Sequence, residues 1–365
     1  MRRFRAGLIV ALVGAFATAA PVFRGVSYTP WGNDLTEPGT AADLEASLDA
    51  MRDVGVNWVA LNVFEFQATP FSTTIAPDYG AYSTPLASAA RAVEEIHERG
   101  MKVLLKPNVD VVSGGWRGDI PGTDAWFDDP NGYKAFIGRW AQWAQAHGVD
   151  GFAVGCEFEA ASGNSAKWRE VVAHVRSHFS DGPLVYAANW TEFASVDWWD
   201  ALDYVGIDAY FPLSALTDPT VAELQATWAL WADLTEVWLA ATYPDMDIIF
   251  TEIGYRSLDG ANMAPWAWSP YGTDNVDLDE QAACYLAALS QTWDRDWMAG
   301  YFWWNWETDP LAGIDPSSGL PMNDYTPQNK PAQGVLRAFY IPEPATLSLL
   351  ALAFAGLLTR RRRPR

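Results

Sequence analysis

Two glutamates each follow a short apolar run, and their side chains could work as a pair. The run 151–156 leads directly to Glu157, and the run 248–250 leads, one residue later, to Glu252. A strand buried on both faces reads as a continuous apolar run, and carboxylates are seldom buried. Two carboxylates that converge on a neutral sugar supply the acid and the nucleophile or base for cleavage of a glycosidic bond. The motifs predict this chemistry if the fold brings the two strand ends together.

The residues around these glutamates add a rival acid and aromatic walls. Glu159 lies two residues after Glu157, so strand alternation places it on the same face and makes it the main alternative for the acid role. The segment GYFWWNWETDP at 300–310 supplies three tryptophans. Alternation predicts Trp304 and Trp306 on one face and Trp303 on the other, so at least one indole should form the floor of a sugar site.

Further polar and aromatic residues stand at the ends of the other predicted strands. Amides, carboxylates and aromatic rings at such positions suit the hydroxyls and flat faces of sugars, although any one of them could cap a loop instead. The candidate substrate contacts are Trp31, Asn62, Glu65, Lys106, Asn108, Asn189, Trp190, Asp208 and Tyr210.

The elements that would position these residues alternate along the chain. The predicted strands are 23–31, 57–67, 102–110, 151–159, 184–190, 204–213, 247–257 and 300–309. The predicted helices are 40–54, 85–99, 130–147, 164–179, a short 196–202, 220–241, 278–297 and 330–340. Eight such units predict an α/β fold, a (β/α)8 TIM barrel, in which catalytic side chains meet at the carboxyl ends of the strands. An open doubly wound sheet is the alternative, but no Gly-rich phosphate loop follows the first strand.

The composition favours a neutral partner. The 365 residues carry a net charge of −21, with arginine clusters at both ends, so the body of the chain repels phosphate backbones and nucleic-acid binding is not expected. The 20 Trp and 14 Tyr suit sugar rings, although most individual Trp are expected in the core. We expect a monomer without a cofactor. We expect no metal either, because the His174 and His178 pair lacks a zinc-protease motif and the acidic stretch 272–280 does not match a calcium loop.

Both ends of the chain carry targeting patterns. Residues 1–19 combine a basic start, an apolar stretch and a small-residue cleavage site, which predicts a secretory signal peptide. Export would permit a disulfide, but we expect Cys156 and Cys284 to be buried free thiols.

At the other end, the Pro-Glu-Pro of 342–344 precedes an apolar run at 345–358 and an arginine cluster. This run is short for a permanent membrane helix, although an ordinary tail anchor is the alternative. Segment 342–365 resembles the PEP-CTERM signal of Gram-negative bacteria. The resemblance implies export, transient membrane anchoring, processing by an exosortase and a place at the cell surface or in the extracellular polysaccharide matrix.

The region between these signals carries a second resemblance. Eight βα units with glutamates at the ends of strands four and seven look like the clan A retaining glycoside hydrolases. Within that clan, GCEFE at 155–159, TEIGY at 251–255 and WWNWE at 303–307 resemble glycoside hydrolase family 113, whose activity is hydrolysis of β-1,4-mannan. The resemblance covers about 23–340, inside one expected catalytic domain of 23–341. It implies Glu157 as acid/base, Glu252 as nucleophile and a polysaccharide or oligosaccharide as substrate.

One position departs from the clan pattern. Many members have Asn just before the acid/base, placed to bond the sugar 2-hydroxyl, and here that position is Cys156. A thiol is a weak donor, so another group must contact that hydroxyl.

Two other classes of function compete with a secreted retaining hydrolase of β-linked neutral polysaccharide. A non-catalytic carbohydrate-binding barrel of the extracellular matrix would keep the aromatic cleft, but it has no need for two carboxylates aimed at one point. A structural matrix protein held by its tail predicts no cleft at all. The pair of glutamates therefore favours the enzyme.

Overall fold

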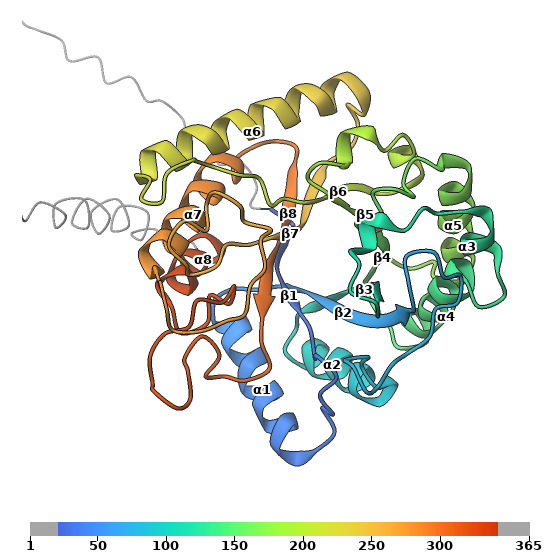
Figure 1. The fold of residues 1–365 in the computed structure, drawn as a ribbon, viewed down its shortest axis with the longest axis horizontal. Helices are drawn as coiled ribbons and strands as arrows, with labels where there is room; N and C mark the ends of the chain where they lie inside the picture. The colour runs from blue at the N-terminus through green and yellow to red at the C-terminus, as the bar shows by residue number, and fades with distance from the viewer. Residues whose placement is uncertain (1–20, 342–365) are drawn as a thin grey trace, which may run out of the picture.

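The structure, a computed structural model, describes residues 21–341, and its strands close into a barrel (Figure 1). The strands are β1 (Phe23–Tyr28), β2 (Trp58–Gln67), β3 (Lys102–Val111), β4 (Gly151–Cys156), β5 (Leu184–Asn189), β6 (Tyr204–Asp208), β7 (Ile248–Ile253) and β8 (Met298–Trp306). Each strand pairs in parallel with its sequence neighbours, and β8 pairs with β1. The predicted (β/α)8 barrel is confirmed.

Helices surround the barrel, and most of them fall where the sequence predicts them. They are α1 (Pro38–Asp53), α2 (Leu86–Glu98), α3 (Asp124–Asp128), α4 (Tyr133–Ala146), α5 (Ser165–His178), α6 (Val221–Thr242), α7 (Leu278–Thr292) and α8 (Pro331–Tyr340). The predicted short helix at 196–202 is wrong, because this stretch holds only the 3₁₀ turn η3 (Trp199–Ala201). The connection after β3 also contains a turn that the sequence analysis misses, η1 (Arg117–Asp119).

Local signals account for where several helices begin and end. Gly55, Gly100 and Gly148 follow α1, α2 and α4 with φ of 90°, 72° and 67°, a backbone region that favours glycine and stops a helix. At the start of α6, Thr220 and Glu223 form a capping box that satisfies free N–H groups of the first turn. These stops set the points at which the chain turns back toward the barrel.

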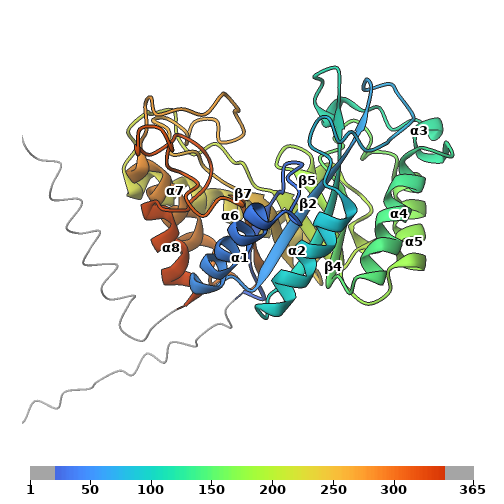
Figure 2. The ribbon, with the colours of Figure 1, turned by 90° about the horizontal axis from the view of Figure 1, so that it is seen from below.

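Two apolar layers hold the barrel. A small cluster inside it includes Phe23, Trp58, Leu104 and Phe302, and a larger cluster packs the outer faces of the strands against the helices. Strands covered on both faces explain why β2 and β4 are buried along their whole length. The long connections that follow the strands gather at one end of the barrel, above the helices (Figure 2).

The remaining observations concern membrane spans, the two ends of the chain, an apolar surface patch and the cysteines. Among residues 21–341, no helix is long and apolar enough to span a membrane. The apolar run at 345–358 and the predicted signal peptide at 1–19 lie outside the described residues.

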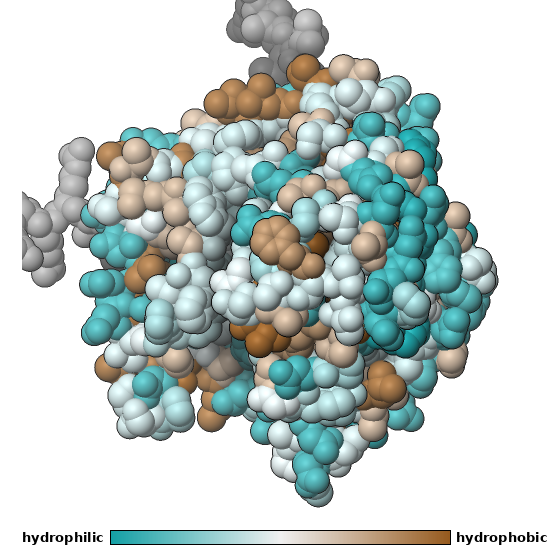
Figure 3. Space-filling model, turned by 45° about the vertical axis from the view of Figure 1, so that its right-hand side comes forward, coloured by the Kyte–Doolittle hydropathy of each residue, from teal (hydrophilic) through white to brown (hydrophobic). Residues whose placement is uncertain are grey.

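The brown patch at the top of Figure 3 lies over α6, where Leu230, Leu234 and Val237 are exposed. Cys156 and Cys284 are buried and free, as expected.

Candidate active site

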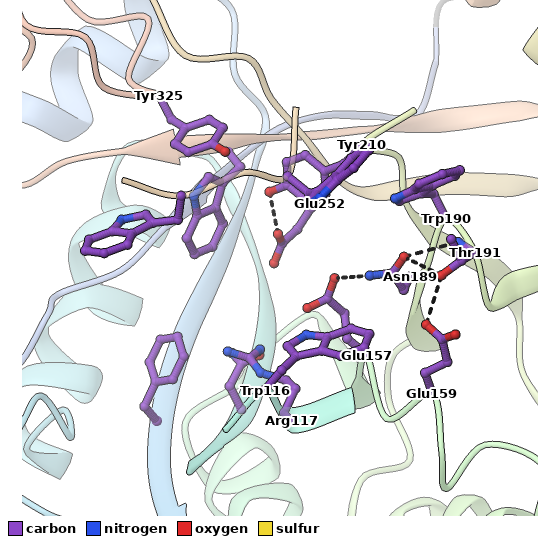
Figure 4. Close-up of a pocket in the computed structure, with 15 residues that line it drawn as sticks. Trp116, Arg117, Glu157, Glu159, Asn189, Trp190, Thr191, Tyr210, Glu252 and Tyr325 are labelled. Atoms are coloured by element: carbon purple, nitrogen blue, oxygen red, sulfur yellow. Dashed lines mark hydrogen bonds between the residues drawn. The ribbon is translucent and has the colours of Figure 1, made fainter. Parts of the chain in front are cut away.

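A cavity of about 690 Å³ opens at the carboxyl ends of the strands (Figure 4). Its size lies within the range of small-molecule sites. Of the residues predicted from the sequence, eight line it: Asn108, Glu157, Glu159, Asn189, Trp190, Tyr210, Glu252 and Trp304. Glu157 and Glu252 extend into this cavity from β4 and β7, so the predicted convergence of the two strand ends is present in the fold.

The backbone holds Glu157 in an unusual conformation. Its φ is 53°, which costs a residue other than glycine about 1–3 kcal/mol. Two contacts with β5 maintain it: Glu157 donates its N–H to the Ala187 carbonyl at 2.8 Å, and the Phe158 N–H bonds the Tyr186 hydroxyl at 2.8 Å. The side-chain amide of Asn189 then donates to Glu157 Oε1 at 3.1 Å. The end of β5 therefore orients both the backbone and the carboxyl group of Glu157.

Different groups surround Glu252. The buried ammonium of Lys106 contacts Glu252 Oε1, and the Tyr210 hydroxyl donates to Oε2 at 2.7 Å. Lys106 also lies 3.6 Å from Asp208 Oδ2, and Asp208 accepts a hydrogen bond from Thr251 Oγ1 at 2.7 Å. Burial lowers the pKa of Lys106, but the charges of Asp208, Glu252 and the neighbouring groups outweigh it, and the net shift is upward. Glu252 thus faces a fixed positive charge beneath the cavity floor.

The environment of Glu157 favours its protonated form. Burial raises the pKa of Glu157, and the negative charge of Glu252 raises it further. The cations Arg117 and Lys106 oppose this shift without cancelling it. Of two carboxylates that share one site, the one with the raised pKa suits the acid role.

Arg117 lies in the cavity wall, close enough to both glutamates that their charges help to raise its pKa. It donates to Asn108 Oδ1 at 2.8 Å and to Asp110 Oδ1 at 2.6 Å, and it lies 3.3 Å from Cys156 Sγ. This guanidinium brings a charged donor to the position beside Cys156, where the clan pattern places an Asn.

Glu192 holds Asn189, the residue whose side-chain amide contacts Glu157. The Tyr186 hydroxyl donates to Glu192 Oε1 at 2.7 Å, and the Asn189 N–H donates to Oε2 at 3.0 Å. Burial raises the pKa of Glu192 to about 7, although these hydrogen bonds oppose the shift. Through Asn189, this buried carboxyl group fixes the amide that contacts Glu157.

This shift predicts a pH-dependent stability. In the folded protein Glu192 has a pKa of about 7, against an ordinary value of 4.5. Its protonated form therefore contributes fully to the free energy of unfolding below about pH 4.5, and this contribution is lost as the pH rises through 7. We expect Glu192→Gln to remove up to about 3 kcal/mol of this fall in unfolding free energy. Urea unfolding at pH 5 and pH 8 measures it, with Glu98→Gln on the exposed face of α2 as control. A Glu192→Gln protein with the wild-type pH dependence would contradict the assignment.

Six predicted contact residues do not line the cavity. Asn62, Lys106 and Asp208 lie buried beneath it, where Asn62 accepts a bond from Asn108 at 3.3 Å. The Trp31 ring lies near the rim, stacked on Phe64 with ring centroids 5.7 Å apart. Glu65 turns outward to α4, and Trp306 is fully buried with its indole N–H bonded to Ser47 Oγ of α1 at 3.0 Å.

The predicted alternation of the tryptophans in β8 is wrong. Val26 and Tyr28 of β1 pair with Trp303 and Trp306, so β8 contains one extra residue between them. Such a bulge moves the following side chain to the other face. Trp303 therefore stacks on Tyr285 of α7, with ring centroids 3.9 Å apart, and Trp306 also faces outward, while Trp304 lines the cavity.

Alternation also fails between Glu157 and Glu159. β4 ends at Cys156, and the positive φ of Glu157 turns the chain away from the strand. Glu159 is exposed and accepts a hydrogen bond from Thr191 Oγ1 at 2.9 Å. Figure 4 shows Glu157 facing Glu252, whereas Glu159 lies farther from Glu252 and directs its carboxyl group toward Thr191.

The cavity also contains residues that the sequence analysis does not single out. They come from β2 and from the connections after β3, β5, β7 and β8: Phe64, Trp116, Arg117, Thr191, Trp266, Trp268 and Tyr325. Trp266 stacks on Trp190 with ring centroids 5.3 Å apart, so the connections after β5 and β7 meet at this wall. Aromatic residues in the segments after the predicted strand ends were the available signal.

One cluster has the composition of a metal site. Among the residues that the structure describes, Cys156, Glu157 and Asp208 bring possible ligand atoms within 4.8 Å of one another. Lys106 and Arg117 already place two cations against this cluster. Burial also raises the pKa of the Cys156 thiol and so disfavours the thiolate that binds metals. We read the cluster as a charge-balanced floor.

Comparisons with known proteins agree with this geometry. The profile of Glycoside Hydrolase Family 113 matches residues 35–327, and that of the PEP-CTERM protein-sorting motif matches residues 341–363. No match was found among curated proteins.

Solved structures give the same picture. A GH113 β-1,4-mannanase superposes with a TM-score of 0.75 at 25% identity, covering 88% of this chain and 100% of that one. The GH113 β-mannanase of Alicyclobacillus acidocaldarius gives 0.72 at 29% identity, covering 87% and 97%. A family 5 mannosidase from Rhizomucor miehei shares the fold, with a TM-score of 0.61 at 12% identity, covering 93% and 96%. The chain belongs to glycoside hydrolase family 113, and it is a glycoside hydrolase that carries a PEP-CTERM sorting motif.

Proposed function

We propose that the protein hydrolyses β-linked neutral polysaccharide, with β-1,4-mannan as the first candidate, by double displacement. The observation that carries the proposal is the contrast between two carboxyl groups in one cavity. Glu157 is partly buried and has a raised pKa, whereas Glu252 contacts the ammonium of Lys106. Such a contrast separates an acid from a nucleophile.

The proposed reaction has two steps. Glu252 attacks the anomeric carbon while Glu157 gives its proton to the leaving glycosidic oxygen, and a covalent glycosyl ester on Glu252 results. Ionised Glu157 then takes a proton from water, the water oxygen attacks the same carbon, and the Glu252 carboxylate leaves. During the first step the Glu252 charge disappears, which removes one of the causes that raise the pKa of Glu157.

The choice of substrate rests on the cavity walls and on similarity. Trp190, Trp266, Trp268 and Trp304 give the cavity broad aromatic surfaces, which suit sugar rings. The related solved structures are described as β-mannanases. A non-catalytic carbohydrate-binding barrel remains the alternative, and it would share these walls.

Reaction with a panel of polysaccharides tests the proposal. We expect purified protein to release reducing ends from mannan and glucomannan faster than from xylan or β-glucan. Because double displacement retains configuration, proton NMR of the first product should show the β-anomer before mutarotation. Binding to these polymers without any released reducing end would favour the non-catalytic alternative, and an initial α-anomer would exclude double displacement.

We also propose that the protein is exported and that its tail is removed. The PEP-CTERM match at 341–363 supports this, together with the sequence pattern at 1–19. Mass spectrometry of protein from its native cells should show a chain that ends near the Pro-Glu-Pro of 342–344. Recovery of mature protein that still carries Arg365 would contradict this processing.

We also propose that the enzyme acts as a monomer, because the closed barrel of a single chain brings both Glu157 and Glu252 into one cavity. Light scattering that shows a dimer at assay concentrations would overturn this point.

A further inference from the structure

A second cavity, of about 200 Å³, lies outside the catalytic one. It is formed by the end of β2, the connection from β2 to α2, and one side of α4. Phe64 lines both cavities, so the end of β2 separates them. Nothing in the proposed reaction uses this second cavity.

Aromatic side chains form its walls. Tyr79 lines the cavity and is 62% exposed, so its ring is accessible from solvent. Trp140 and Trp143 of α4 meet edge to face with ring centroids 5.5 Å apart, and Trp143 stacks on His147 at 4.1 Å. These contacts fix Trp140 and Trp143, so the two indoles offer flat apolar surface at little entropic cost.

Its polar groups form a balanced pair. Glu65 accepts hydrogen bonds from Arg139 at 2.8 Å and from the Trp140 indole N–H at 3.0 Å. The bond to Glu65 uses one of the five N–H donors of the Arg139 guanidinium, and each Glu65 oxygen keeps a lone pair. The charges cancel, so hydroxyl groups that both donate and accept fit this pair better than an anion or a cation does.

We propose that the cavity is a second saccharide site, which holds a hexose residue of a neutral glycan chain. Tyr79 and Trp143 contact the sugar ring, while Glu65 and Arg139 bond its hydroxyls. The sequence predicts Glu65 as a sugar contact at the catalytic mouth of the barrel, whereas this proposal assigns it to a separate site. The inference goes beyond the proposed function, because holding a glycan chain at this site requires no cleavage.

The test uses two variants and a matched control on the same connection as Tyr79. Tyr79→Ala removes an exposed ring, and Trp143→Leu replaces the second ring that contacts the sugar with an aliphatic side chain. Phe71→Ala removes another ring, 81% exposed, that does not line the cavity. Affinity electrophoresis in gels that contain glucomannan, xylan or β-glucan measures binding to polymer, and an aryl β-mannoside measures the catalytic site alone.

We expect Tyr79→Ala and Trp143→Leu to weaken retardation by at least one polymer about 5- to 10-fold. Hydrolysis of the aryl glycoside should stay unchanged, and Phe71→Ala should match the wild type in both assays. Wild-type retardation of both variants in every gel would overturn the proposal. If the wild-type protein cleaves none of the polymers but the two variants still lose retardation, the result would support this site and refute the proposed function.

Discussion

Glu252→Gln is expected to lower turnover by about 10⁴-fold or more, for every substrate and leaving group. The change keeps the shape of the side chain, its place at the end of β7 and a group that can hydrogen-bond Tyr210. It removes the oxygen nucleophile, so neither an activated nor an ordinary leaving group can be displaced. Steady-state assays on mannan and on an aryl β-mannoside measure the loss, and no burst of released phenol should precede it.

A second variant in the same cavity shows whether the loss of turnover is specific to Glu252. Glu159→Gln is the comparison within the same cavity, because Glu159 lies at the rim and accepts a bond from Thr191. We expect Glu159→Gln to change turnover by less than about tenfold, since rim contacts are exposed to water. A Glu252→Gln enzyme with more than a hundredth of wild-type turnover would exclude Glu252 as the nucleophile.

The fold could be predicted from the sequence because the signals are redundant. Each βα unit repeats an apolar run, a turn and a helical pattern, so an error such as the short helix at 196–202 leaves the barrel unchanged. Glu157 and Glu252 could be found for the same reason. Each follows an apolar run at the end of a strand, and in a parallel barrel all such ends meet at one mouth.

Side-chain direction was harder to predict, because it depends on single residues. One extra residue in β8 places Trp303 and Trp306 on the same outer side, and a similar irregularity in β4 precedes Glu157. The sequence contains no local mark for either bulge. An error of one position reverses every later inference about which face a side chain occupies.

The long connections set a second limit. Trp266 and Trp268 lie within the segment between β7 and α7, and they reach the cavity only because that segment folds back over the barrel. Periodicity assigns no direction to such segments. Lys106 shows a related limit. The sequence does not tell whether this lysine of β3 contacts substrate or lies buried against Asp208 and Glu252, as it does here.

Glu157→Ala should be far milder than Glu252→Gln on an activated substrate. Loss of a general acid costs about 10²- to 10⁴-fold on mannan, whose leaving sugar needs a proton. A nitrophenolate leaves without one, so the glycosyl ester on Glu252 should still form at a useful rate. Its hydrolysis should then be slow, because no base remains to activate water, and a burst of nitrophenol followed by a slow phase is the expected signature. Equal losses on mannan and on the aryl glycoside would exclude Glu157 as the acid.

The stereochemistry of azide rescue separates the two roles. Azide needs no base, so with Glu157→Ala it should attack the glycosyl ester, break the bond to Glu252 and give a β-glycosyl azide. With Glu252→Ala, azide can only displace the leaving group directly from a β-glycoside, and the product should be the α-azide. The opposite pairing of variants and products, read by proton NMR, would mean that the two roles are exchanged. Wild-type activity in Glu157→Ala, with loss only on changing Glu159, would instead assign the acid role to the rim carboxylate. The hydrogen bond that Glu157 accepts from Asn189 and the raised pKa of Glu157 argue that Glu157 is the acid/base and Glu252 the nucleophile.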